Sequence, residues 1–221
     1  MRLAVQAVLA LSAAMLLTAC NGQRPLHVLH DDAQIAAKAR NYEKARADFE
    51  EYLNRRPDDP AIRYELSQVC MGQGDYKEAV RQLTIASDVQ PLNTKYIDGL
   101  AEAMFQAGEK DTLTNYLARL SRERAGVADY NRQGVYAAKL GNVDEAQQAF
   151  LTAAKLDQGM NVGPQLALSD FYGSLGDRDK QVTRLRMAYY IDQANPGVIE
   201  RAHALGEPLG PSFMRFPAER P

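Results

Sequence analysis

The sequence predicts an all-α fold, an α-solenoid of about five stacked helix pairs closed by a C-terminal capping helix. Three residues recur at an interval of 34 positions, so that Tyr42, Ala45 and Pro57 precede Tyr76, Ala79 and Pro91. The composition is also helical, since 46% of the residues are hydrophobic, 24% are charged and tryptophan is absent. A helix pair of about 34 residues cannot bury its apolar face alone, so the copies are expected to stack.

The clearest copy runs from Pro60 to Pro91. Its small, aromatic and aliphatic residues follow a helical spacing and are Tyr64, Leu66, Cys70, Gly74, Tyr76, Ala79, Leu83 and Ala86. This spacing resembles the tetratricopeptide repeat, which has a period of about 34 residues. The resemblance implies helix-turn-helix units in which the first helix of each pair lines the inner face of the array.

The same frame places the other copies along the chain. We expect repeats at residues 31–57, 60–91, 94–121, 127–158 and 162–193, followed by a cap at 197–205. The third copy departs from the pattern because Lys110 and Leu113 replace its aromatic residue and its alanine, and Gln181 replaces the alanine of the fifth. Small residues such as Gly134 are expected where paired helices cross, because they let the helices approach closely. Phe150 is among the larger residues expected to fill the space beside them.

The C-terminal end predicts a helix and then a tail. Asn195 and Pro196 are a typical N-cap and first helical residue, and Gly206 is a typical stop. The segment 206–221 is rich in proline and has no helical period, so we expect a disordered tail. An alternative is that its apolar residues dock into the groove of the array or onto a partner; these are Phe213, Met214 and Phe216.

The N-terminal residues have the layout of a secretory signal. Arg2 precedes an uncharged run from Leu3 to Leu17, which is short for a membrane span. The following Leu17-Thr18-Ala19-Cys20 resembles the bacterial lipobox, which implies a signal peptide at 1–19 and a diacylglyceryl group on Cys20. Residues 20–30 would then be the lipidated N-terminus and tether. The resemblance also implies sorting to the outer membrane, facing the periplasm, because Asn21 is not the aspartate that retains lipoproteins in the inner membrane of enteric bacteria.

Reactive and cofactor-binding motifs are missing from the sequence. The net charge of −2 offers no basic patch for nucleic acid. No glycine-rich phosphate loop, nucleophile elbow or zinc-protease motif is present, so we expect no enzyme activity, no cofactor and no small-molecule substrate. His27, His30 and Asp31 could be imagined as a metal site, but they lie beside the tether, and a polar lead-in to the first helix is favoured. Cys70 is expected to be a buried free thiol.

The predicted functional surface is the inner face formed by the first helices. Carrying the repeat frame along the chain gives a set of mixed aromatic, aliphatic and charged residues: Tyr64, Gln68, Met71, Lys95, Asp98, Glu102, Phe105, Asn131, Val135, Lys139, Leu166 and Asp170. Such a groove suits an extended peptide or a docking helix. The lysine and asparagine clamp that chaperone-binding members of the family use is not present at the matching positions.

The leading hypothesis is a membrane-anchored adaptor that binds proteins through this groove in the bacterial cell envelope. In build the chain is similar to lipoproteins that assist assembly of pili of the type IV or tight-adherence class, or of outer-membrane complexes. Two alternatives stay open at this point. One is an envelope enzyme or metal-binding protein that uses the repeats as a scaffold, and the other is a passive structural spacer.

Overall fold

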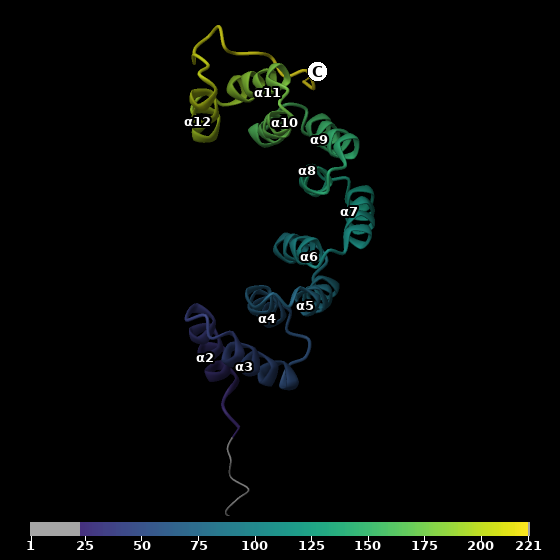
Figure 1. Cartoon of the computed structure of the whole chain (residues 1–221), viewed down its shortest axis with the longest axis vertical. Coiled ribbons are helices and arrows are strands. Elements are labelled where there is room, and N and C mark those ends of the chain that lie inside the picture. The colour runs from purple at the N-terminus through teal and green to yellow at the C-terminus, as the bar shows by residue number, and fades with distance from the viewer. Residues whose placement is uncertain (1–22, 221) are drawn as a thin grey trace, which may run out of the picture. The chain divides into compact units, whose positions relative to one another are not determined.

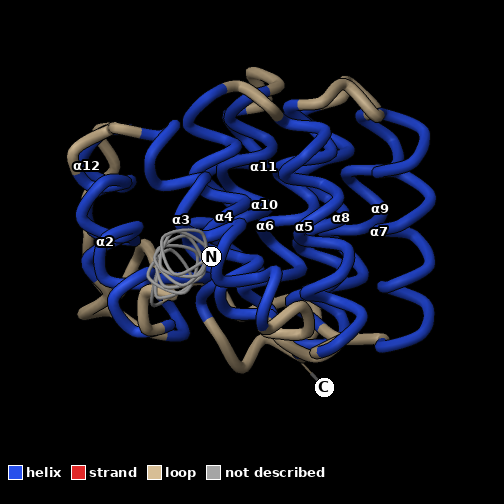
Figure 2. Tube along the Cα trace, turned by 90° about the horizontal axis from the view of Figure 1, so that it is seen from below, coloured by secondary structure: helices blue, strands red, loops and turns tan. Residues whose placement is uncertain are grey.

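The computed structural model describes residues 23–220, and every regular element in that range is a helix (Figures 1 and 2). The eleven helices of this range are α2 (Leu26–Lys38), α3 (Tyr42–Arg55), α4 (Pro60–Gln73), α5 (Tyr76–Val89), α6 (Thr94–Gln106), α7 (Lys110–Arg124), α8 (Val127–Lys139), α9 (Val143–Asp157), α10 (Val162–Ser174), α11 (Arg178–Ile191) and α12 (Pro196–Leu205). The prediction of five helix pairs and a capping helix is confirmed. Within residues 23–220, no helix has both the length and the hydropathy that a membrane span requires.

The chain divides into two compact units, and each is described by itself. Unit 1 ends at Tyr96 and holds α2 to α5 with the start of α6, while unit 2 begins at Ile97 and holds the remainder. In unit 1, α3 packs against both α2 and α4, and α4 packs against α5. In unit 2, each helix from α8 to α11 packs against the helices before and after it. Packing between consecutive helices is what a solenoid requires. We call α2, α4, α6, α8 and α10 the first helices, and their partners the second helices.

The helix boundaries follow from the local sequence. Asp59 caps α4 by accepting hydrogen bonds from the amides of residues 61 and 62, and Pro60 occupies the first turn, where no amide is needed. Asn195 and Pro196 do the same for α12, as predicted. Gly74 ends α4 with a φ of 78°, a left-handed conformation that glycine adopts without steric cost. Short capped helices with tight turns therefore come directly from residues visible in the sequence.

Small residues hold the paired helices close together, as expected from the sequence. A Cβ atom added at Gly134 would lie 2.8 Å from the ring of Phe150, so no larger residue fits there without movement. Ala79 and Ala146, at matching positions of their repeats, are fully buried. In unit 2, Phe150 also lies 5.3 Å from Phe171, centroid to centroid, which extends the core from the fourth pair into the fifth. These residues pack the core between the helices, so a binding surface is expected on the other faces of the helices.

The N-terminal boundary differs from the prediction. Helix α2 begins at Leu26, whereas the first repeat was expected to begin at residue 31 after a tether. Leu29 and Ala33 are fully buried and give this stretch its helical period, which the neighbouring histidines and aspartates had obscured. The predicted signal peptide and Cys20 lie outside the described residues.

The C-terminal segment after Gly206 is packed against unit 2, which corrects the prediction of a disordered tail. Phe213 is 4% exposed and its ring lies 5.6 Å from that of Tyr189. Farther along, the carboxylate of Glu219 pairs with Arg184 and accepts a hydrogen bond from Gln165 at 3.0 Å. The segment packs where α11 meets α12 and then along α11, and it also contacts α10, because its apolar residues join a cluster that includes the predicted groove residue Leu166. Prolines had suggested disorder, but they also suit an extended strip that follows a surface.

Candidate protein-binding groove

The structure places all the predicted groove residues on first helices, within α4, α6, α8 and α10. Their exposure varies along the array. Gln68 and Lys95 are exposed, Val135 is 41% exposed, and Met71 is half-buried. Many of the others contact a residue on the next first helix, so the face is partly closed by side chains of the protein itself.

On this face of unit 1, a pocket of about 360 Å³ lies between α2 and α4. Its apolar lining includes Ala37, Phe49 and Val69, and its polar lining includes Gln34, Glu65 and Gln68. Phe49, from the second helix α3, is only 1% exposed and forms the base. An apolar hollow with a few polar groups is a suitable site for a side chain of a binding partner.

Polar contacts across the two first helices flank this pocket. The imidazole Nε2 of His30 lies 3.0 Å from the carboxylate of Glu65, and the amide of Gln34 donates to the same carboxylate at 3.1 Å. One turn earlier on α4, the ring of Tyr64 lies 5.7 Å from that of Tyr96, and the Lys95 ammonium lies 4.1 Å from the centre of the Tyr64 ring. The two contacts of Glu65 join the walls of the pocket on α2 and α4, and Gln68 is exposed on the α4 wall.

In unit 2, α6 and α8 are joined by side chains that were predicted to line the groove. The hydroxyl of Tyr136 donates to Glu102 at 2.9 Å, and the Lys139 ammonium lies 3.2 Å from the same carboxylate. The Phe105 ring lies 5.8 Å from that of Tyr136, and the Lys139 ammonium lies 5.1 Å from the centre of the Phe105 ring. Hydrogen bonds from Gln106, Tyr136 and Lys139 lower the pKa of Glu102, and burial raises the pKa of Tyr136. At neutral pH, Glu102 is therefore ionised and Tyr136 keeps the proton that it donates.

A second link between α6 and α8 centres on a buried carboxylate. Asp129 is 2% exposed and pairs with Arg124 at 3.0 Å and Arg132 at 2.8 Å. Arg132 also donates to the predicted groove residue Asp98 at 2.5 Å. The connection between α7 and α8 is the place where one residue is missing from the regular period, and Asp129 braces that connection.

At the C-terminal end, two predicted groove residues pack against the capping helix. Asp170 accepts two hydrogen bonds from the guanidinium of Arg201, both at 2.7 Å. Leu166 packs on the apolar cluster that includes Val198 and Ala202 of α12, so it is part of the core and not an open groove position. The sequence could not reveal this because the cap follows Leu166 by about one repeat and its orientation is a tertiary property. On α8, the side-chain oxygen of Asn131 is shielded from solvent, and no group in the described residues donates to it.

Comparison with known proteins agrees with this geometry. Residues 36–101 and 130–159 match family models described as tetratricopeptide repeat. The chain folds as a tetratricopeptide-repeat solenoid. No curated protein matches its sequence.

Solved tetratricopeptide structures share the fold at low sequence identity. A crystal structure of MamA protein is 17% identical, with a TM-score of 0.55 over 84% of this chain and 98% of that one. TTC0263, a thermophilic TPR protein in Thermus thermophilus, is 18% identical, with a TM-score of 0.54 over 81% of this chain and 98% of that one. MamA from Desulfovibrio magneticus RS-1 is 13% identical, with a TM-score of 0.54 over 77% and 97%. Identities this low establish architecture, which many functions share.

The tetratricopeptide frame also identifies groove residues that the sequence analysis missed. Tyr64 and Gln68 lie 34 positions after His30 and Gln34, so the same frame places His30 and Gln34 on the inner face of the first repeat. The first repeat was expected to begin at residue 31, whereas α2 begins at Leu26. Helix α2 thus forms one wall of the pocket through Gln34, Ala37 and Lys38.

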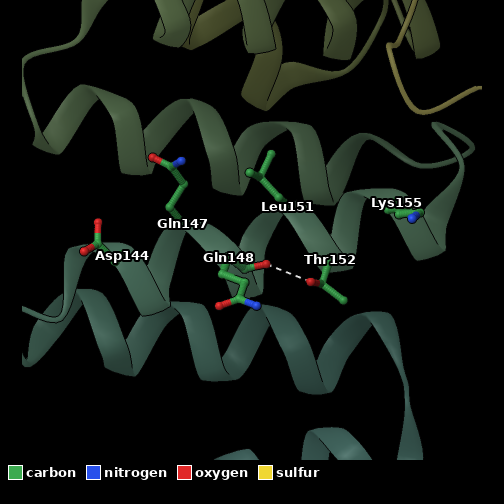
Figure 3. A pocket seen from close by; sticks show the side chains of 6 residues that line it. All are labelled: Asp144, Gln147, Gln148, Leu151, Thr152 and Lys155. Carbon is green, nitrogen blue, oxygen red and sulfur yellow. Dashed lines mark hydrogen bonds between the residues drawn. The ribbon is translucent and has the colours of Figure 1, made fainter.

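A hollow of about 400 Å³ lies on the second helix α9 (Figure 3). All six lining residues belong to that one helix, and they include Asp144, Leu151 and Lys155. Figure 3 shows them spaced along α9, with the Thr152 hydroxyl donating to the Gln148 carbonyl at 2.8 Å inside the helix itself. Binding sites usually draw polar groups from several elements toward one point, and this surface does not.

Among the described residues, neither a metal-binding cluster nor a reactive thiol is found. No group of three His, Cys, Asp or Glu side chains within residues 23–220 is arranged to hold a metal ion. His30 is engaged with Glu65, and His27 is exposed. Cys70 is a fully buried free thiol, as predicted, and its burial raises its pKa to about 11. At neutral pH this thiol is protonated and a poor nucleophile.

Proposed function

We propose that this chain is a lipid-anchored scaffold of the bacterial cell envelope that binds a partner protein along its first helices. The observation that carries the proposal is the pocket between α2 and α4, with Phe49 at its base and Gln68 exposed beside it. Solenoid repeats create concave surfaces of this kind, and a partner that inserts an apolar side chain gains affinity by removing it from water.

The partner is expected to present an apolar anchor within an extended or helical segment. The apolar walls of the pocket accept the anchor, while the exposed Gln68 offers its amide group to the partner's backbone or polar side chains. Farther along, Val135 adds an exposed apolar position on α8, and the charged cluster of Glu102 and Lys139 adds polar contacts. Apolar anchors surrounded by polar contacts are typical of specific protein interfaces.

Membrane attachment is proposed from the sequence. The uncharged run up to Leu17 and the lipobox-like Leu17-Thr18-Ala19-Cys20 support cleavage before Cys20 and its modification with diacylglycerol. Two acyl chains would give stable anchoring, at about 0.8 kcal/mol per buried CH₂. Asn21 favours the outer membrane, facing the periplasm. We propose that the scaffold helps to assemble a pilus, secretion or outer-membrane complex there.

Filling the pocket tests the proposed binding site. In the Ala37→Phe variant the added ring occupies the space between α2 and α4, whereas Ala47→Phe places the same ring on the exposed side of α3. Chains carrying an affinity tag are crosslinked in membranes, and captured proteins are identified by mass spectrometry. We expect a partner that the unmodified chain and Ala47→Phe both capture and that Ala37→Phe loses. Equal capture by Ala37→Phe, at an unchanged melting temperature, would contradict the proposal.

The anchor is tested separately by the mass of the N-terminal peptide from membrane fractions. We expect a peptide that begins at Cys20 and carries the mass of a diacylglyceryl group, and its loss together with membrane association in the Cys20→Ser variant. An unmodified peptide, or membrane association that survives Cys20→Ser, would contradict lipid anchoring without affecting the groove.

A further inference from the structure

Arg24 lies at the start of the described residues and contacts both α2 and α3. Its guanidinium donates to Asp48 at 2.6 Å and to Glu51 at 2.7 Å, and it lies 3.5 Å from Asp32. Its backbone carbonyl accepts a hydrogen bond from Arg55 at 2.6 Å. Residues on both α2 and α3 thus hold the chain at this point.

The partners of Arg24 make this attachment specific. Asp48 is 3% exposed, and among the described residues its second oxygen has no hydrogen-bond donor, so loss of Arg24 would leave a buried carboxylate without its cation. The hydrogen bond from Arg24 is also the main cause that lowers the pKa of Glu51. Arg55 holds Glu51 and the Arg24 carbonyl together. The acceptors and donors converge on one residue of what was predicted to be a tether.

The length of chain outside this attachment is short. Cys20 and Arg24 are four positions apart, and a fully extended chain spans at most about 3.6 Å per residue, or about 14 Å in all. Helix α3 runs from Tyr42 to Arg55, and at 1.5 Å per residue its two ends are about 20 Å apart. A lipid on Cys20 could therefore reach only the end of the α2–α3 pair that carries Arg24 and Arg55.

We propose that Arg24 is a latch that shortens the lipid tether and holds the Arg55 end of the α2–α3 pair against the membrane surface. This inference rests on the proposed lipid anchor at Cys20, and it specifies the lipid headgroup layer as the surface that this end of unit 1 faces. Without the contacts of Arg24, the chain from Cys20 to Leu26 would be a flexible linker. Neither end of α3 would then lie preferentially at the bilayer surface.

The test uses tryptophan as a probe, since the chain contains none. Asn54 and Lys44 are both exposed on α3, and they are ten residues or about 15 Å apart along its axis. The chain from Cys20 onward, with Cys70→Ala so that Cys20 is its sole thiol, is coupled through Cys20 to a maleimide lipid in phosphatidylcholine vesicles. A nitroxide attached to lipid headgroups then quenches tryptophans that lie near the surface, and circular dichroism checks the fold of every variant.

We expect quenching of the Asn54→Trp variant to be at least twofold stronger than that of Lys44→Trp. Adding Arg24→Gln should remove most of the difference, whereas the exposed arginine change Arg81→Gln should leave it intact. Ten Gly-Ser residues inserted between Gly22 and Gln23 should lower the quenching of both probes while Arg24 stays bound. Equal quenching at the two probes, or no effect of either Arg24→Gln or the insertion, would overturn the latch. Because the lipid is attached chemically, this result is independent of whether cells modify Cys20.

Discussion

Tyr136 donates a hydrogen bond of 2.9 Å to Glu102, and the two residues are separated by one repeat period of 34 positions. Asp98 and Arg132 are joined across the same two helices at the same interval. Equivalent faces of successive first helices are thus linked by side chains. Groove residues in unit 2 therefore contribute to stability as well as forming a surface, which changes what substitutions there should do.

The Tyr136→Phe variant removes the hydrogen bond to Glu102 and keeps the ring. We expect it to lower the free energy of unfolding by about 1 kcal/mol at pH 7, as measured by urea denaturation. The pKa of Glu102 is lowered in the folded chain, so the stability that its charge contributes is present above the unfolded pKa of about 4.3 and is lost as pH falls through the folded value. The difference between the variant and the unmodified chain should shrink in acid, and a constant difference would contradict the charged hydrogen bond.

The Phe105→Ala variant should lose stability, because its ring contacts Tyr136 and lies beneath Lys139. We expect a decrease of about 1 to 3 kcal/mol in the free energy of unfolding, below the cost of a fully buried phenylalanine. Val135→Ser is the better probe of binding, since Val135 is 41% exposed and its replacement should change stability by less than about 0.5 kcal/mol.

Removing Asp129 should be the most damaging single charge change in unit 2. Its carboxylate is buried between Arg124 and Arg132, so Asp129→Ala takes from Arg124 its carboxylate partner and leaves Arg132 paired with the exposed Asp98. Breaking a buried pair in this way costs about 3 to 5 kcal/mol. Asp98→Ala is a matched control, because the Asp98 side chain is 61% exposed and its pair should contribute about 1 kcal/mol or less. Similar urea midpoints for the two variants would show that Asp129 does not brace the α7–α8 connection.

The C-terminal segment should detach in acid. Burial alone would raise the pKa of Glu219, but the hydrogen bond and charge of Arg184 outweigh it and hold the pKa below its usual value. The stabilisation is therefore complete above the unfolded pKa of about 4.3 and is lost as pH falls through the folded value. The segment is probed by limited proteolysis, with a neutral protease at pH 7 and an acid-active protease below about pH 4. Cleavage should be slow at pH 7 and rapid in acid. Glu219→Gln should be cut rapidly at both, and equal protection at both pH values in the unmodified chain would contradict this contact.

The fold was largely predictable because its determinants are local. The interval between Tyr42 and Tyr76 indicated the repeat period. Asn195 and Pro196 predicted the start of a helix, and Gly134 predicted a close helix crossing. Each of these residues acts through backbone geometry or side-chain size, which are visible in the sequence. These properties are enough to place helices and their buried faces.

The contacts that shape the groove and the two ends of the chain were not predictable in the same way. Arg24 looked like part of a flexible tether, and Glu219 looked like part of a disordered tail, because their partners are distant in the sequence and charged residues are usually solvated. Pro217 packs closely against Gly159, a contact that depends on how the tail crosses α11. The sequence predicted the α4 wall of the pocket through Gln68. The wall on α2 was not predicted, because the start of that helix was placed incorrectly.

The most direct test of the proposed function is site-specific photocrosslinking in membranes. A photoreactive phenylalanine is placed at Gln68 or Val135 on first helices, and at Thr84 or Thr152 on second helices as controls. We expect one partner protein to crosslink to both Gln68 and Val135 positions and to neither control. Adducts that form at Thr84 and Thr152 while the groove positions remain unreacted would contradict binding along the first helices.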